Sequence, residues 1–343
     1  MADSPAPRIT ITDVAREAGV SRTTVSHALN GRGQVDPATR LKVEDAARSL
    51  GYRPNRHAQR LRSGGANMIA LMSSMPSTIS GGPSRLGFFM EVASVAASSA
   101  LERGLVLALV PPNKPGQNTL NLLDIDGALV IEPQAGDPQL AALLQQGLPV
   151  VSIGRPGGDT VDVPYVDLLS GPATQMLLTH MLASGARQIA LVVGTSERTS
   201  YTQAEQAYAA MAAGHGMKPV VLRQDESLGE DGGYAAARQL LKEHPQLDAL
   251  LVMVDAFAVG AVHYAQEAGL RIPEDLMVAT RYDGLRARSC EPPLTALDLH
   301  LESVAQQAVD LLFEHLRGDT QRRMTTSALP SLALRRSTQR KPR

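Results

Sequence analysis

Residues 11–61 read ITDVAREAGVSRTTVSHALNGRGQVDPATRLKVEDAARSLGYRPNRHAQRL, and this stretch decides the fold of the first part of the chain. Thr10 begins a first predicted helix, because Asp13 stands at the reciprocal capping position three residues on. Gly19 ends that helix. Ser21 begins a second helix that runs through Leu29. The pattern therefore predicts two short helices joined by a tight turn.

A third predicted helix starts at Asp36-Pro37, because proline is tolerated at the first helical position, and Gly51 follows its end. A fourth short helix after Pro54 ends at a Ser-Gly-Gly run at 63–65, which we interpret as the first domain boundary. Apolar side chains at helical spacing predict one small core, made of Ile11, Val14, Ala15, Val25, Leu29, Val35, Val43, Ala46 and Leu50.

Two helices joined by a tight turn are typical of a helix-turn-helix, whose second helix enters the DNA major groove. Arginine can donate two hydrogen bonds to guanine, and threonine and histidine can reach base edges. Small helical domains without a DNA partner show the same spacing, so spacing alone leaves both interpretations open. The candidate contacts are Arg22, Thr23, Ser26 and His27 for bases, Ser21, Thr24 and Asn30 for phosphates, and Thr10 at the start of the first helix.

From residue 66 onward, apolar strands alternate with amphipathic helices, which predicts parallel sheets covered by helices on both faces. So many strands suit two linked lobes better than one sheet. The predicted strands are 68–72, 105–110, 128–131, 150–153, 189–193, 220–222, 249–254 and 276–280. The predicted helices between them include 91–103, 171–184, 203–215, 231–244 and 259–268.

The quoted run resembles the DNA-binding head of the LacI/GalR family, whose D-V-A, A-G-V-S, T-V-S and L-N-G motifs it matches nearly throughout. The resemblance continues with DIDGALVIEP at 124–133, GLPVVSIGR at 147–155 and PPLTALDL at 292–299. It implies an all-α helix-turn-helix head and an α/β, doubly wound, two-lobed effector domain like the periplasmic binding proteins. It also implies a homodimer that binds a pseudo-palindromic operator in double-stranded DNA, most simply as a repressor.

The expected domains are a head at 1–53, a hinge helix and linker at 54–65, a two-lobed body at 66–334 and a basic, frayed tail at 335–343. The resemblance places the lobe crossings near Ser170, Leu299 and Met324. The N-lobe would then hold 66–169 and 300–323, and the C-lobe 170–298 and 325–334.

In this family the hinge helix forms when two subunits meet on the operator, and a leucine enters the minor groove at the central base step. The matching wedge is Leu61, with Ala58 and Asn55 on the same helix face. A plain linker with solvated arginines is the alternative. A leucine among four arginines has no core to join, which favours the wedge.

The resemblance also implies effector contacts at Arg198, Asp283 and Asp255, at strand ends that face the cleft between the lobes. Each has a structural alternative: Arg198 could pair with Glu197 or Asp283, and Asp255 could cap the helix that follows it. The chain contains no tryptophan and 4 phenylalanines, so aromatic side chains to stack on a sugar ring are scarce. Further candidates are Tyr165, Tyr201 and Ser77.

The sequence departs from the family at Arg281-Tyr282-Asp283-Gly284, where the family usually has G-[FY]-D-[DN]. Two arginines near the cleft, Arg198 and Arg281, would favour an anionic effector such as a sugar acid or phosphosugar. The alternative is that Arg281 points into solvent. We therefore expect a sugar or sugar derivative as effector and leave its charge open.

Composition and charge agree with this interpretation. Residues 1–65 hold 11 Lys+Arg and 6 Asp+Glu, whereas the remainder holds 22 and 28, so a basic head precedes an acidic body. One cysteine excludes a disulfide framework, and no secretory signal or membrane-spanning run is present, so we expect a cytoplasmic protein.

Two other classes of protein were considered, a solute-binding transport protein and an enzyme. A transport protein needs a secretory signal and has no use for residues 10–62. An enzyme needs a catalytic constellation, and we find no P-loop, zinc-type histidine spacing or G-x-S-x-G motif. No catalytic residue, metal or cofactor is therefore expected.

Overall fold

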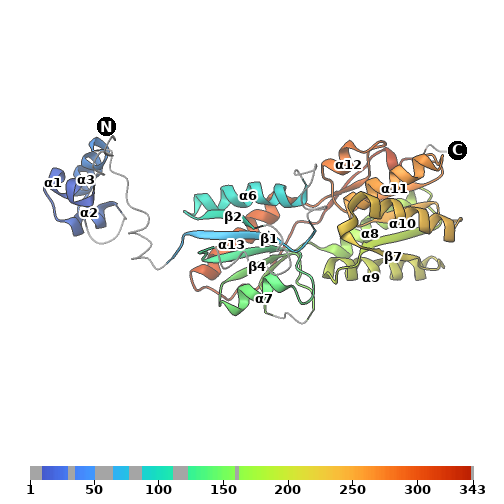
Figure 1. The fold of residues 1–343 in the computed structure, drawn as a ribbon, viewed down its shortest axis with the longest axis horizontal. Coiled ribbons are helices and arrows are strands. Elements are labelled where there is room, and N and C mark those ends of the chain that lie inside the picture. Colours follow the sequence, from blue (N-terminus) through green and yellow to red (C-terminus); the bar gives the residue numbers. More distant parts are fainter. Residues whose placement is uncertain are drawn as a thin grey trace, which may run out of the picture. The chain divides into compact units, whose positions relative to one another are not determined.

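The computed structural model of the 343-residue chain describes residues 10–29, 35–50, 65–76, 87–110, 123–158 and 162–340. It divides into two compact units, Met1–Gly65 and Ala66–Arg343. Figure 1 shows both units, which we call the head and the body and describe separately.

The described residues of the head form three helices, α1 (Ile11–Ala18), α2 (Arg22–Leu29) and α3 (Pro37–Ser49). Gly19 ends α1 in the left-handed region, at φ 65°, where a residue with a Cβ would be strained. Asp36 caps α3 by accepting hydrogen bonds from the Ala38 and Thr39 backbone N–H groups, both at 3.0 Å. The head core contains every residue predicted for it, with Val14, Val25 and Val43 fully buried at its centre.

The body contains a six-stranded sheet of order β11-β5-β4-β3-β1-β2 and a four-stranded sheet of order β7-β6-β8-β9, both wholly parallel, so the α/β prediction is confirmed. A separate short antiparallel pair is formed by β10 and β12. The strands are β1 (Met68–Ser73), β2 (Val106–Val110), β3 (Gly127–Ile131), β4 (Val150–Ile153), β5 (Tyr165–Asp167), β6 (Ile189–Gly194), β7 (Val221–Gln224), β8 (Ala249–Val252), β9 (Met277–Thr280), β10 (Ala296–Asp298), β11 (Met324–Thr326) and β12 (Ser331–Ala333).

We call the six-stranded sheet and its helices the N-lobe, and the four-stranded sheet and its helices the C-lobe; Figure 1 shows the two side by side. The N-lobe helices are α6 (Phe88–Glu102), α7 (Pro138–Gln145) and α13 (Leu301–Leu316). The C-lobe helices are α8 (Ser170–Ala183), α9 (Thr199–Gly214), α10 (Gly229–Glu243), α11 (Asp255–Glu267) and α12 (Leu285–Ser289), with short 3₁₀ turns η3 (Glu226–Leu228) and η4 (Arg336–Thr338).

Alternating strand residues cover the two faces of the N-lobe sheet, as expected from the two-residue period of a strand. Ile69 and Leu71 belong to the core that α6 and α13 cover, whereas Ala70 and Met72 belong to a second core that includes Leu140 of α7. The sheet is therefore buried on both faces, which explains why its strands read as continuous apolar runs.

The chain crosses between the lobes from β5 to α8, from β10 to α13, and from β11 to β12. The first two crossings each hold a non-glycine residue in the left-handed region, Leu169 and His300, both at φ 52°. The third crossing was predicted near Met324, but Met324–Thr326 form β11, which pairs with β5 inside the N-lobe sheet. That crossing follows Thr326 instead.

The C-terminal segment, residues 335–340, is packed against the C-lobe, so the prediction of a frayed tail is wrong for these residues. Ser337 and Thr338 are fully buried. The Ser337 hydroxyl donates to the Val278 carbonyl at 2.6 Å and accepts from the Thr295 N–H at 2.8 Å. Buried hydroxyls satisfied on both sides hold a segment in place, which composition could not show. Residues 341–343 lie outside the described residues.

Candidate functional site

The second helix of the head exposes the side chains predicted to read DNA. Arg22, Thr23 and His27 are exposed and Ser26 is half-buried, whereas Val25 on the opposite face is fully buried. A helix with one face in a core and the other exposed can enter a groove without unfolding the domain. These side chains stay candidate base contacts.

Two of the predicted phosphate contacts, Ser21 and Thr24, lie at the start of α2. The Ser21 Oγ accepts a hydrogen bond from the Thr24 N–H at 3.0 Å, so Ser21 caps the helix. Thr10 is exposed, and its N–H and hydroxyl donate to the Asp13 carboxylate at 2.9 and 2.8 Å. Capping and phosphate binding use the same helix ends, because both satisfy N–H groups that the helix leaves unpaired.

Five of the predicted contacts lie outside the described residues. They are Asn30, Asn55, Ala58 and Leu61 for DNA, and Ser77 for the effector.

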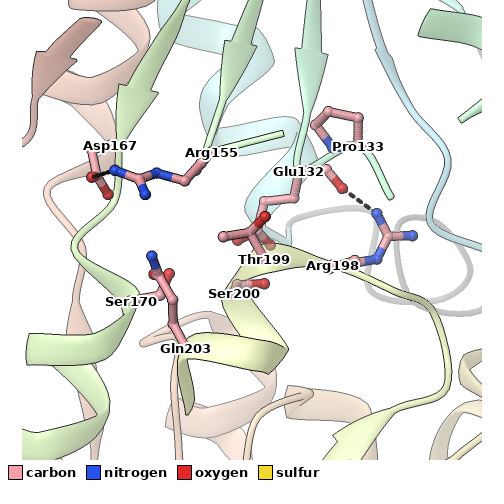
Figure 2. Close-up of a pocket in the computed structure, with 9 residues that line it drawn as sticks. All are labelled: Glu132, Pro133, Arg155, Asp167, Ser170, Arg198, Thr199, Ser200 and Gln203. Carbon is pink, nitrogen blue, oxygen red and sulfur yellow. Dashed lines mark hydrogen bonds and ion pairs between the residues drawn. The ribbon is translucent and has the colours of Figure 1, made fainter. Parts of the chain in front are cut away.

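Two pockets lie between the lobes of the body. The first, which we call the polar pocket, has N-lobe residues Glu132, Pro133, Arg155 and Asp167 opposite C-lobe residues Ser170, Arg198, Thr199, Ser200 and Gln203 (Figure 2). The second, which we call the aromatic pocket, includes Phe88, Phe89, Tyr201, Asp255, Arg281 and Tyr282. Both pockets lie at the carboxyl ends of parallel strands, where ligands bind in folds of this kind.

Arg198 is the most deeply buried charged residue that lines the pockets, with 1% of its surface exposed. It donates to the Glu132 carbonyl, as Figure 2 shows, and to the Ser74 hydroxyl at 3.3 Å, both across the cleft. Its Nε lies 3.9 Å from the Glu226 carboxylate. The partners expected from the sequence, Glu197 and Asp283, are therefore not those in the structure. Its Nε and Nη2 have no hydrogen-bond partner among the described residues.

Arg281 points into the cleft and not into solvent, with 5% of its surface exposed. Its Nη1 donates to the Glu132 carboxylate of the N-lobe at 2.8 Å, and its Nη2 donates to the Ser170 hydroxyl at 3.2 Å. Because its charge is already balanced, Arg281 no longer argues for an anionic effector.

Glu132 is the residue that sequence reasoning missed. It follows β3 with φ at 40°, a backbone conformation that costs a non-glycine residue energy. Gly154, at φ 92°, lies beside it, and a Cβ there would come within 2.9 Å of the Glu132 Cγ. The only available signal was an acid directly after an apolar strand in DIDGALVIEP.

Asp255 and Tyr201 both line the aromatic pocket and are both buried. Burial raises the pKa of Asp255, an effect that the Arg286 guanidinium 3.5 Å away opposes. Its carboxylate also accepts from the Ala256 N–H at 2.8 Å, so it satisfies the start of α11 while facing the pocket. Burial, and then the negative charge of Glu226, raise the pKa of Tyr201, whose hydroxyl has no partner among the described residues.

Asp283 and Tyr165 line neither pocket. The Asp283 carboxylate pairs with Arg335 at 2.6 Å and with Arg288 at 3.3 Å, so the C-terminal segment engages it. The Tyr165 ring lies under the Arg155 guanidinium at 5.5 Å, a cation–π contact beside the polar pocket. Both stay predicted effector contacts, but Asp283 already has two cationic partners.

The aromatic pocket gathers aromatic side chains that no sequence pattern singled out. Phe88 packs edge-on against Tyr282 with ring centroids 5.4 Å apart, across the two lobes. The Tyr282 hydroxyl donates to the Glu91 carboxylate of the N-lobe. These residues come from α6 and from the loop after β9, so only the fold brings them together.

Among the described residues, no helix is long and apolar enough to cross a membrane, and no cluster of His, Cys, Asp or Glu could hold a metal ion.

The family comparisons match both parts of the chain. Residues 10–55 match the model of bacterial regulatory proteins of the lacI family, and residues 178–338 match a periplasmic binding protein-like domain. The two matches fall in the head and the body, in the same order as the sequence predicted.

Among curated proteins, the chain is similar to the HTH-type transcriptional regulator CelR of Thermobifida fusca, with 32% identity over 91% of this chain and 93% of that protein. Among solved structures, a CelR–cellobiose complex has a TM-score of 0.70 at 29% identity and covers 96% of this chain and 100% of that one. A lac repressor dimer bound to operator and an anti-inducer has a TM-score of 0.78 at 25% identity and covers 97% and 99%. These relatives are named as regulators.

Proposed function

The chain belongs to the LacI family of DNA-binding transcriptional regulators, and from that premise we propose that it is a homodimeric repressor whose carbohydrate effector binds between the two lobes. The observation that carries the effector proposal is the pair of pockets between the lobes, where several buried polar atoms have no hydrogen-bond partner among the described residues. We also propose that it acts in the cytoplasm.

The DNA side of the proposal rests on α2 and on the residues that follow the head core. The exposed Arg22, Thr23 and His27 would contact bases in the major groove of each half-site. Two copies related by a two-fold axis would bind half-sites about one helical turn apart, so the operator is expected to be pseudo-palindromic. Leu61 would enter the minor groove between the half-sites.

The effector side rests on chemistry that suits hydroxyl-rich ligands. The Arg198 Nε and the Tyr201 hydroxyl are buried without hydrogen-bond partners among the described residues, and such groups are costly unless a ligand or water satisfies them. Phe88, Phe89 and Tyr282 offer ring surfaces to the apolar face of a sugar. The similar CelR structure contains cellobiose, which makes neutral oligosaccharides the first compounds to test.

Control of DNA binding would pass through the contacts between the lobes. An effector shifts an equilibrium only by its different affinity for the two states, so it must favour either the open or the closed cleft. Glu132, Arg198 and Arg281 join the lobes in the arrangement of this structure. As a repressor, the protein would release its operator when a sugar changes that arrangement.

The decisive experiment measures binding of the intact protein to the DNA upstream of its own gene by electrophoretic mobility shift, with random duplex as competitor. We expect a specific complex that a neutral mono- or oligosaccharide dissociates at fixed salt, since phosphate contacts make affinity salt-dependent. A carbohydrate that strengthens the complex would reverse the sign of control. Absence of any preferred duplex at moderate salt, with and without sugars, contradicts the proposal.

A further inference from the structure

We infer that the effector is uncharged and that Glu132 is the residue that excludes anions from the cleft. The inference rests on the proposed function, because it concerns the same pockets. It also reverses the expectation drawn from two arginines in the sequence.

Every charged side chain that lines the two pockets has a partner of opposite charge close by. The pairs are Arg281 with Glu132 at 2.8 Å, Arg198 with Glu226 at 3.9 Å, Arg155 with Asp167 at 3.7 Å, and Asp255 with Arg286 at 3.5 Å. Among the described residues that line the pockets, each cation therefore has an acidic partner, and none is left over for an anionic ligand. A charged ligand would add an uncompensated charge to a closed cleft.

The Glu132–Arg281 pair decides this balance because it is buried and crosses the cleft. Both side chains are 6% exposed, so solvent screens them little. Glu132 stays in this position although its backbone lies in the left-handed region and its side chain needs a glycine, Gly154, beside it. An incoming phosphate or carboxylate would have to displace the Glu132 carboxylate from Arg281 or lie beside it as a like charge.

The buried groups that remain unsatisfied need hydrogen-bond acceptors and not negative charge. They are the Nε and Nη2 of Arg198, the Nε of Arg281 and the hydroxyl oxygens of Ser200 and Tyr201, none of which has a hydrogen-bond partner among the described residues. Hydroxyl and ether oxygens can accept from such donors without bringing charge. An uncharged, oxygen-rich ligand therefore fits both the charges and the hydrogen bonds of the cleft.

The Glu132→Gln variant tests this inference, because it leaves Arg281 without its neutralising partner while keeping a side chain of the same shape. The probe is inorganic phosphate, which needs no knowledge of the effector. The melting temperature of the intact protein is followed from 0 to 20 mM phosphate, with chloride holding ionic strength constant. We expect Glu132→Gln to bind phosphate at least tenfold more tightly than the wild type, seen as a saturable rise in melting temperature.

Two control variants separate the cleft from general charge effects. Glu314→Gln removes a carboxylate from an ion pair with Arg322 outside both pockets, so it should respond to phosphate like the wild type. The double variant Glu132→Gln/Arg281→Gln restores neutrality and should lose the gained response. If Glu132→Gln is unfolded in chloride and shows no melting transition, bound phosphate should stabilise its folded state, so a transition should appear when phosphate is added.

The inference is overturned if the wild type binds phosphate as tightly as Glu132→Gln, or if Glu132→Gln responds no more than Glu314→Gln. It is also overturned if phosphate does not restore an unfolded Glu132→Gln, or if the double variant keeps the response. None of these readouts uses DNA. If a neutral sugar releases the wild-type protein from its operator but Glu132→Gln does not respond to phosphate, only this inference fails and the proposed function stands. If Glu132→Gln binds phosphate but the protein prefers no DNA duplex, only the proposed repressor function fails and this inference stands.

Discussion

Arg281 and Asp283 stand two residues apart after β9, yet the structure gives them opposite surroundings. Arg281 is paired in the cleft with Glu132, whereas Asp283 is turned toward Arg335 and Arg288. The single arginine in the RYDG motif therefore places a cation, and not an acid, inside the aromatic pocket.

Arg22 is the residue of α2 that we expect to discriminate most strongly between bases. Replacing it with alanine should relax preference at one base pair by about 1–3 kcal/mol and leave the other positions unchanged, because one bidentate contact reads one base. Fluorescence anisotropy with single-substitution operator duplexes measures this. Arg48→Ala, at another exposed arginine, on α3, serves as the control. Equal weakening on every duplex would instead identify Arg22 as a phosphate contact.

Among the elements, the C-terminal segment has a structural role that its composition hid. Truncation after residue 334 removes the Ser337 hydrogen bonds and the ion pairs of Arg335 and Arg340. Each buried partner left unsatisfied costs about 1–3 kcal/mol, so the melting temperature should fall by roughly 5 °C or more. Calorimetry of the effector domain within the full chain measures the change.

Truncation after Arg340 is the control, since it removes the terminal charges of Lys341 and Arg343 but keeps residues 335–340 and their contacts. It should shift the melting temperature by less than about 1 °C. Should the longer truncation not express in folded form, Ser337→Ala provides a milder test of the same contacts. Equal stability of both truncations would show that the packed segment contributes nothing.

The proposed hinge helix is a second element with a testable role. Leu61→Ala should weaken binding to the operator by about 1.5–3 kcal/mol, the value of burying a leucine side chain, while binding to random duplex stays the same. The comparison is made by titrating operator and random DNA at one salt concentration. Leu41→Ala, at an exposed leucine on α3, should change neither affinity. Equal losses on both duplexes would contradict the wedge.

At the scale of the whole molecule, the balance between open and closed lobes depends on a few contacts across the cleft. Tyr282→Phe removes the hydroxyl that donates to Glu91 but keeps the ring packed on Phe88. A hydrogen bond to a charged group contributes about 1.5–3 kcal/mol, so the ratio of closed to open molecules should fall about tenfold or more. Small-angle scattering without effector should then show a larger radius of gyration.

Tyr234→Phe is the control for this experiment. It removes a tyrosine–glutamate hydrogen bond of the same kind, from Tyr234 to Glu267 at 2.8 Å, but inside the C-lobe. It should leave the scattering unchanged. If the two variants scatter alike, the Tyr282–Glu91 contact does not hold the lobes together.

The sequence by itself determined the helix-turn-helix head, the parallel α/β body and the family, because helix ends, apolar periodicity and long motifs are local signals. It placed the head core residues Val14, Val25 and Val43 correctly. The tertiary structure decided which charges meet. Glu132 and Arg281 are 149 residues apart in the chain, and Asp283 and Arg335 are 52 apart, so no local pattern could pair them. Electrostatic balance depends on distance and burial in space, and these exist only once the lobes have folded and closed.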